Sequence, residues 1–265
     1  MTTAPVWASV VAAGLAGGYL VLLRRRPTAL RTWPTWRTGA WLTGTAVIAV
    51  GLVLAGSGAG DHRVHMAAHL ALGMYAPLAL VLGAPVRLLL GSLGHASRLR
   101  VTALLASGVV RALSHPVMAA VLNVGGMFVL YLSPLYAASA EHAGLHLLVI
   151  GHFILAGYLY TWAIAGPDPA PHRPSLVVRA AVLVAAAGAH AFLAKLLYAR
   201  AGELAGAHPG HGTAAGADVV GLEAAARLMY YGGDVAEILL ALLLFGVWYR
   251  RRAGRHQGRA PSRSR

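Results

Sequence analysis

Residues 61–85 read DHRVHMAAHLALGMYAPLALVLGAP, and this stretch decides both the class of the protein and where its chemistry is sought. Its apolar run, 65–84, contains no Asp, Glu, Lys or Arg. About twenty apolar residues are enough for an α-helix to cross the hydrocarbon core of a bilayer. We therefore predict a transmembrane helix here, kinked or stopped at Pro77 and Pro85.

Further apolar runs of similar length lie on both sides of this one. They cover 4–23, 39–56, 116–133, 143–165, 176–198 and 228–248. The 265-residue chain is 58% hydrophobic and 11% charged, which is too apolar for a water-soluble core. We predict an all-α, polytopic membrane protein with a seven-helix transmembrane domain over 1–249 and a basic, disordered cytoplasmic tail over 250–265.

The arginines between the apolar runs predict the orientation of the chain. Segments 24–37, 87–115 and 166–179, together with the tail, hold eighteen arginines, and the alternate connections hold three. Cytoplasmic loops carry the positive excess, so the N-terminus is predicted outside and the C-terminus in the cytoplasm. The net charge of +14 then reflects contact with the lipid bilayer, and we expect no nucleic-acid partner. Residues 91–114 fit an amphipathic helix on the cytoplasmic surface.

Histidines are concentrated on one side of this predicted topology. Nine of the thirteen fall at or just inside the outer face. On the helix quoted above, His62, His65, Met66 and His69 share an arc of roughly 100°. Imidazole is the commonest protein ligand for borderline transition metals, and the chain has no cysteine, so a soft ligand must be methionine. The alternative is that these histidines cap the helix or bind water among the headgroups.

Other spans add ionisable groups on the same side. The candidates are His142, His146 and His152 in 143–165, His190 and Lys195 in 176–198, and Asp234 and Glu237 in 228–248. Ionisable groups inside a membrane are costly unless they are paired or face a polar cavity. Lys195 with Asp234 or Glu237 is a plausible ion pair, either as a structural salt bridge or as part of a path for metal.

Several motifs recur in the order found in a known family. Their residues are His65-Met66-Ala67-Ala68-His69-Leu70, Ala76-Pro77, Val81-Leu82-Gly83-Ala84-Pro85-Val86, His115-Pro116, Ser133-Pro134-Leu135-Tyr136, His146 to His152-Phe153, Gly157-Tyr158-Leu159-Tyr160-Thr161-Trp162, Gly166-Pro167-Asp168-Pro169 and, more loosely, Tyr231-Gly232-Gly233-Asp234 with Glu237. On these residues the chain resembles the CtaG-like cytochrome c oxidase assembly proteins of caa-type oxidase in Gram-positive bacteria.

This resemblance implies a multi-pass protein of the bacterial cell membrane that helps deliver or insert copper into haem–copper oxidase at the extracytoplasmic face. Oxidase subunits would be its partners and a copper ion its cargo. The resemblance points to His65, His69, His146 and His152 as metal ligands, with His62, His142 and His190 as auxiliaries. Met66 adds a thioether, which Cu(I) accepts. No catalytic triad, phosphate loop or dinucleotide fingerprint indicates an enzyme.

Three other functions remain open from the sequence. A membrane haem protein would use axial histidines such as His69 or His190. An ion- or proton-coupled transporter would use histidines with Asp234, Glu237 and Lys195 as a relay, although no inverted repeat is visible. A scaffold would bind oxidase subunits through helix faces without holding metal.

Overall fold

The apolar runs of the sequence form helices in the computed structural model, which describes residues 4–26, 32–57, 61–170, 173–207 and 215–257. Within these ranges there is no strand. Six of the described helices are long and apolar enough to cross a membrane, namely Val6–Arg24, Thr35–Ser57, His62–Leu82, Ala143–Ala165, Leu176–Ala199 and Val219–Tyr249. The run 116–133 forms a shorter apolar helix, Pro116–Tyr131. The chain thus has the form of a multi-pass membrane protein, and the count of seven spans stays a prediction.

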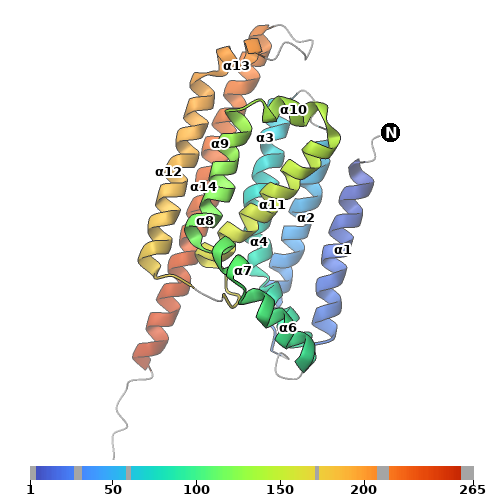
Figure 1. The fold of residues 1–265 in the computed structure, drawn as a ribbon, viewed down its shortest axis with the longest axis vertical. Coiled ribbons are helices and arrows are strands. Elements are labelled where there is room, and N and C mark those ends of the chain that lie inside the picture. The colour runs from blue at the N-terminus through green and yellow to red at the C-terminus, as the bar shows by residue number, and fades with distance from the viewer. Residues whose placement is uncertain (1–3, 27–31, 58–60, 171–172, 208–214, 258–265) are drawn as a thin grey trace, which may run out of the picture.

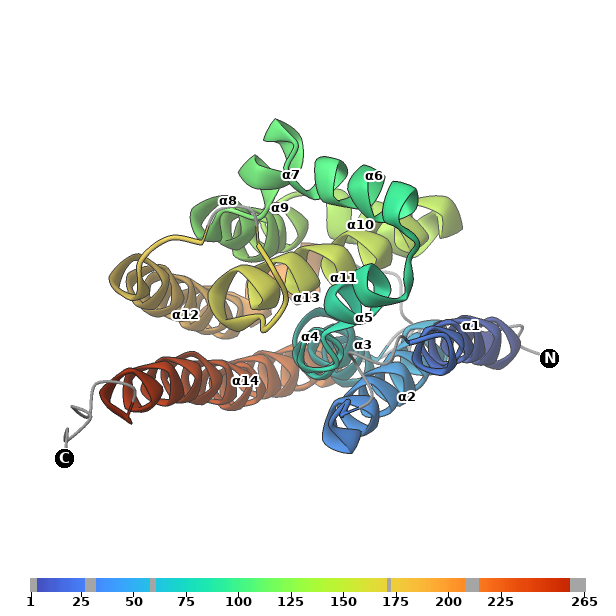
Figure 2. The same ribbon diagram turned by 90° about the horizontal axis from the view of Figure 1, so that it is seen from below.

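The long helices pack as two layers (Figures 1 and 2). One layer contains α1 (Ala4–Arg24), α2 (Thr35–Ser57), α3 (His62–Leu70) and α14 (Ala215–Gln257); the other contains α8 (Pro116–Ala120), α9 (Gly126–Tyr131), α11 (Ala143–Ala165) and α12 (Leu176–Ala199). Helix α1 begins and α14 ends at opposite ends of the bundle. We call the end where α3 and α11 begin the outer end, after the side predicted from the arginines.

Two helices contain a widened, π-helical turn. One, Ala71–Tyr75, joins α3 to α4 (Ala76–Leu82), and the other, Val121–Gly125, joins α8 to α9. Proline lacks an amide hydrogen, so Pro77 cannot continue the regular hydrogen-bond ladder. The helix widens before this proline and continues to Leu82, and the next helix begins at Pro85. Such turns are rare in proteins as a whole, but those that occur are often found at functional sites.

The close approach of α11 to the first widened turn depends on a glycine. A Cβ atom placed on Gly157 would overlap the carbonyl oxygen of Gly73 and lie 3.1 Å from Cγ of Pro77. In a regular helix that carbonyl would accept the amide hydrogen that Pro77 lacks. Because Gly157 has no side chain, α11 can pack closely against the helix that contains Gly73 and Pro77.

At the end opposite the outer end, two of the motif stretches meet at Asp168. This carboxylate accepts hydrogen bonds from the backbone amides of Val86 (3.1 Å) and Arg87 (2.9 Å), the first free amides of α5 (Pro85–Ser92). The hydroxyl of Tyr19 donates to the carbonyl of Gly83 at 2.8 Å. These bonds tie α1, the start of α5 and the segment after α11 into one base.

Short helices lie near both ends of the bundle. The predicted amphipathic segment forms α6 (His95–Leu105) and α7 (Gly108–Leu113), neither of which buries a side chain, and in Figure 2 both lie along one edge of the bundle. At the outer end lie α10 (Leu135–Glu141) and α13 (Ala201–Ala207). Exposed Leu99 and Leu104 on α6, beside Arg98 and Arg100, fit a headgroup position.

The final helix corrects the predicted start of the tail. The sequence predicts disorder over 250–265, but the backbone of α14 is helical through Gln257. Arginines in this stretch do not end the helix because Arg is a good helix former and basic residues stabilise a helix C-terminus. Residues 258–265 lie outside the described residues.

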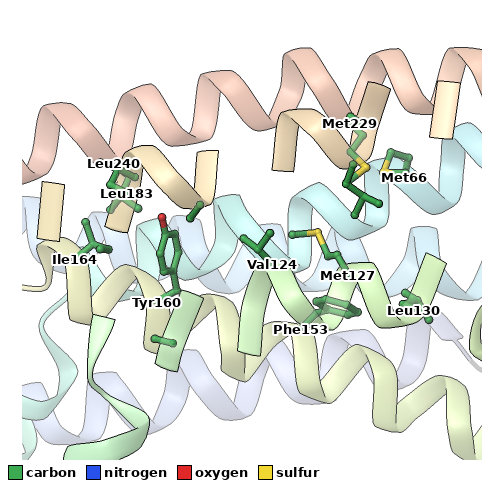
Figure 3. Close-up of a cluster of buried hydrophobic side chains, with 14 of the residues drawn as sticks. Met66, Val124, Met127, Leu130, Phe153, Tyr160, Ile164, Leu183, Met229 and Leu240 are labelled. Atoms are coloured by element: carbon green, nitrogen blue, oxygen red, sulfur yellow. The ribbon is translucent and has the colours of Figure 1, made fainter. Parts of the chain in front are cut away.

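The core is apolar, and so is much of the surface. Figure 3 shows the larger cluster of buried side chains, drawn from α3, α9, α11, α12 and α14. Large apolar residues such as Leu148, Leu155 and Val184 point outward along the long helices and are mostly exposed. This pattern suits a lipid environment, because soluble proteins rarely expose apolar patches of this extent.

Candidate functional site

The histidines of α3 form a column that runs from the outer end into the core. Asp61 fixes the start of this helix, because its carboxylate accepts hydrogen bonds from the amides of Arg63 (2.8 Å) and Val64 (3.4 Å). His62 and His65 follow, one turn apart and partly buried, and the deeper His69 is only 8% exposed. We call His62, His65 and His69 the histidine column.

Two tyrosines hold the outer part of this column. The hydroxyl of Tyr131, on α9, lies 3.4 Å from Nε2 of His65, and that of Tyr136, on α10, lies 3.5 Å from Nδ1 of His62. The ring of His65 also meets Tyr136 edge-on, with centroids 5.0 Å apart. Both hydrogen bonds are long, so they orient the imidazoles without binding them tightly. Tyr131 is absent from the residues that the sequence predicts for this site.

At its inner end the histidine column meets a methionine. Nε2 of His69 lies 3.0 Å from Sδ of Met127 on α9, and the ring of Phe153 contacts that of His69 edge-on. Sequence reasoning missed Met127. The one available signal was the absence of cysteine, which makes each methionine in a span a candidate soft ligand.

The histidines of α11 divide into two groups. His146 lies close enough to His65 to interact with it electrostatically, as does His62. His142 is exposed, and its Nδ1 lies 3.1 Å from the carbonyl oxygen of Ala138. His152 is also exposed, with Nε2 3.0 Å from the carbonyl oxygen of Leu122 in the second widened turn. The structure therefore places His146 within electrostatic range of His65 and pairs His142 and His152 with backbone carbonyls.

A buried polar group lies deeper in the bundle, at the α12–α14 contact. His190 is 0% exposed, and its Nδ1 lies 3.7 Å from Oε1 of Glu237. Neither ring nitrogen has a hydrogen-bond partner among the described residues. Gly233 packs against the imidazole, since a Cβ there would come within 2.5 Å of Nδ1. His190 also lies within electrostatic range of His69 and of Asp234.

Lys195 takes a different position from the predicted ion pair. Its Nζ lies over the ring of Tyr230, 5.2 Å from the centroid. Among the described residues, the salt-bridge contact of Glu237 is with His190. A cation over an aromatic face gains about 0.5–1 kcal/mol at an exposed site. The contact with Tyr230 therefore accounts for the position of Lys195 without an ion pair.

The described residues contain no group of three or more His, Asp or Glu side chains already arranged to hold a metal ion. The histidine column and His146 therefore supply donors that are near one another without converging on one point. His208 and His211, weaker candidates in the outer loop, lie outside the described residues, as does His172. On the inner side, His115 accepts a hydrogen bond from the amide of Val117 and caps α8.

Similar proteins occur in three Mycobacterium species. It is 37% identical over 188 residues to an uncharacterized protein of Mycobacterium leprae (strain TN), an alignment that covers 66% of this chain and 28% of that protein. It is 38% identical over 192 residues to uncharacterized proteins of Mycobacterium bovis and Mycobacterium tuberculosis, covering 69% of this chain and 28% of each. The aligned part is thus well under a third of these relatives' own length.

No solved structure matches the chain significantly. A family model, by contrast, matches residues 17–251, a range that runs from the second half of α1 into the last turns of α14 and includes all the motifs quoted from the sequence. That model describes the cytochrome c oxidase caa3 assembly factor. The chain belongs to the cytochrome c oxidase caa3 assembly factor family.

Proposed function

We propose that the protein assists assembly of a haem–copper oxidase by binding copper in transit at its outer end. The donors are His62 and His65 of the histidine column together with His146 of α11. The observation that carries this proposal is the inward column of imidazoles, which leads from the outer end of the bundle to a buried methionine. Oxidase subunits are the proposed recipients, and the family supports that partner because it is one of oxidase assembly factors.

The contacts of these imidazoles suit an ion that must be released again. A structural metal site is closed by four fixed ligands, whereas transfer requires an open coordination position. His65 and His62 each carry one long hydrogen bond to a tyrosine, which an arriving ion can displace at small cost. Imidazoles are neutral near pH 7 and bind copper through the free ring nitrogen, so loading need not bury a carboxylate.

The test removes the outer donors and leaves the rest of the bundle intact. In cells that depend on this protein, the double variant His65→Ala/His146→Ala is expected to lower the copper content of the oxidase, and the Cu(II) bound per purified chain, at least about tenfold, because both outer donors leave the site. The control is His142→Ala/His152→Ala, which removes two histidines bonded to backbone carbonyls. It is expected to retain copper delivery.

The alternative functions give different results in the same preparations. If the oxidase of the His65→Ala/His146→Ala strain has normal copper content while the variant is inserted at wild-type level, the proposal is contradicted. The scaffold function would then remain. A Soret band that co-purifies with the wild-type chain and disappears in His69→Ala or His190→Ala would indicate a haem protein instead.

A further inference from the structure

We propose a second, deeper site that binds Cu(I) through Nε2 of His69 and Sδ of Met127, with Met66 and Met229 as further thioether donors. The inference rests on the proposed function, since it gives copper a place to go after the outer imidazoles. It differs from the outer site in ligand chemistry and in depth. His69 lies roughly two helical turns from Asp61, at the inner end of the histidine column.

The contact between His69 and Met127 is the first observation. The nitrogen and the sulfur lie 3.0 Å apart, although they come from α3 and α9. Both side chains are buried, Met127 to 1% exposure, so water does not compete for either donor. Two soft or borderline donors aimed at each other in a dry place can accept one ion after a small side-chain adjustment.

The second observation is that the other thioethers of the core gather in the same region. Met66 is 4% exposed and Met229 is 0% exposed, and both belong to the same buried cluster as Met127. In Figure 3 the sulfur ends of Met66, on α3, and Met229, on α14, come together in the view, in the part of the core that also holds Met127. Half of the six methionines of the chain therefore lie in this cluster.

The donor set selects the ion. Thioethers favour Cu(I), whereas Mg²⁺ and Ca²⁺ prefer oxygen ligands and structural zinc sites are built from thiolates and imidazoles. The chain contains no cysteine, so methionine is its sole sulfur ligand. A set of one imidazole and two or three thioethers is neutral, which suits a monovalent ion better than a divalent one in a medium of low dielectric.

The next polar layer supplies a charge to balance the ion. His190 lies within electrostatic range of His69, and Glu237 lies 3.7 Å from His190. Burying one positive charge costs several kcal/mol unless an opposite charge is near. A cation bound at His69 would favour the ionised form of the Glu237 carboxyl group, which lies outside the proposed coordination sphere.

The experiment titrates the purified full chain with Cu(I) against a chromophoric Cu(I) chelator, and separately with Cu(II). Met127→Leu is expected to weaken Cu(I) binding at least about tenfold, and to reduce the copper–sulfur scattering in X-ray absorption spectra, while Cu(II) binding stays near that of wild type. Leucine has nearly the volume of methionine, so the fold should lose less than about 1.5 kcal/mol. Met118→Leu is the matched control, because Met118 is 43% exposed on α8.

The outcomes separate this site from the proposed function. Unchanged Cu(I) affinity and unchanged sulfur scattering in Met127→Leu would overturn the proposal of a deeper site. The contact between His69 and Met127 would then be only an N–H···S hydrogen bond. Normal oxidase copper in His65→Ala/His146→Ala would overturn the proposed function, whatever the methionine variants do. Loss of Cu(I) binding in Met127→Leu, with retention in Met118→Leu and in His65→Ala/His146→Ala, would establish the deeper site as independent of the outer imidazoles.

Discussion

Replacing Gly157 by alanine is expected to lower the free energy of unfolding by about 3 kcal/mol, the upper end of the range for overpacking. The new methyl group would overlap the carbonyl oxygen of Gly73 and come within 3.0 Å of its carbon. Both are backbone atoms, so no side-chain rotation relieves the contact. Helix α11 must therefore move away from the helix that contains Gly73. Unfolding in detergent micelles, followed by circular dichroism, measures the loss.

A second glycine of α11 provides the control. Gly151 has nothing within 4 Å of the position that a Cβ would take. Alanine is favoured over glycine in a helix by about 1 kcal/mol, so Gly151→Ala is expected to be neutral or stabilising. Equal destabilisation by the two substitutions would show that the close approach to Gly73 does not set the effect.

Replacing Asp168 by alanine is expected to cost a similar amount, about 3 kcal/mol, because two partly buried amide groups at the start of α5 lose their acceptor. These are the amides of Val86 and Arg87, which otherwise bond to the carboxylate at 3.1 and 2.9 Å. Burial raises the pKa of the Asp168 carboxyl. Asp168→Asn keeps one of the two accepting oxygens, so it should cost less than removing both.

The exposed cap of α3 is the matched comparison for Asp168. Asp61 makes the same kind of bonds to two amides, but in an exposed position. Water can replace its oxygens, so Asp61→Ala is expected to cost about 1 kcal/mol. If Asp168→Ala is no more harmful than Asp61→Ala in the same unfolding assay, the base described here does not hold the helices together.

Much of the architecture could be predicted because transmembrane helices are encoded by local hydropathy. The run 143–165 matches α11 at both ends, and 176–198 matches α12 closely. The widened turns were not predicted, because a π-helical turn changes the hydrogen-bond ladder without changing the apolar composition. The continuation of α14 to Gln257 was missed for a related reason: charge suggested disorder, but arginine does not oppose a helix.

Residue spacing alone predicted the part of the candidate site on α3, and His146 of α11 was predicted from the family resemblance. Spacing places His62, His65 and His69 on one side of α3. In the structure each of these side chains contacts a residue of α9 or α10. Helix α11 is apolar all round, so its sequence does not indicate which side faces inward. Phe153 is buried there and its neighbour His152 is exposed. Met127 and Tyr131 were missed because pairing across helices depends on their relative rotation.

The tyrosine contacts of the outer histidines make ion loading and helix packing compete for the same atoms. Nε2 of His65 and Nδ1 of His62 are the ring nitrogens that meet Tyr131 and Tyr136. One imidazole nitrogen cannot serve a hydroxyl and an ion together. An ion held through these nitrogens would therefore break both hydrogen bonds between the phenol groups and α3, so that the loaded and empty forms would present different surfaces to a docking protein.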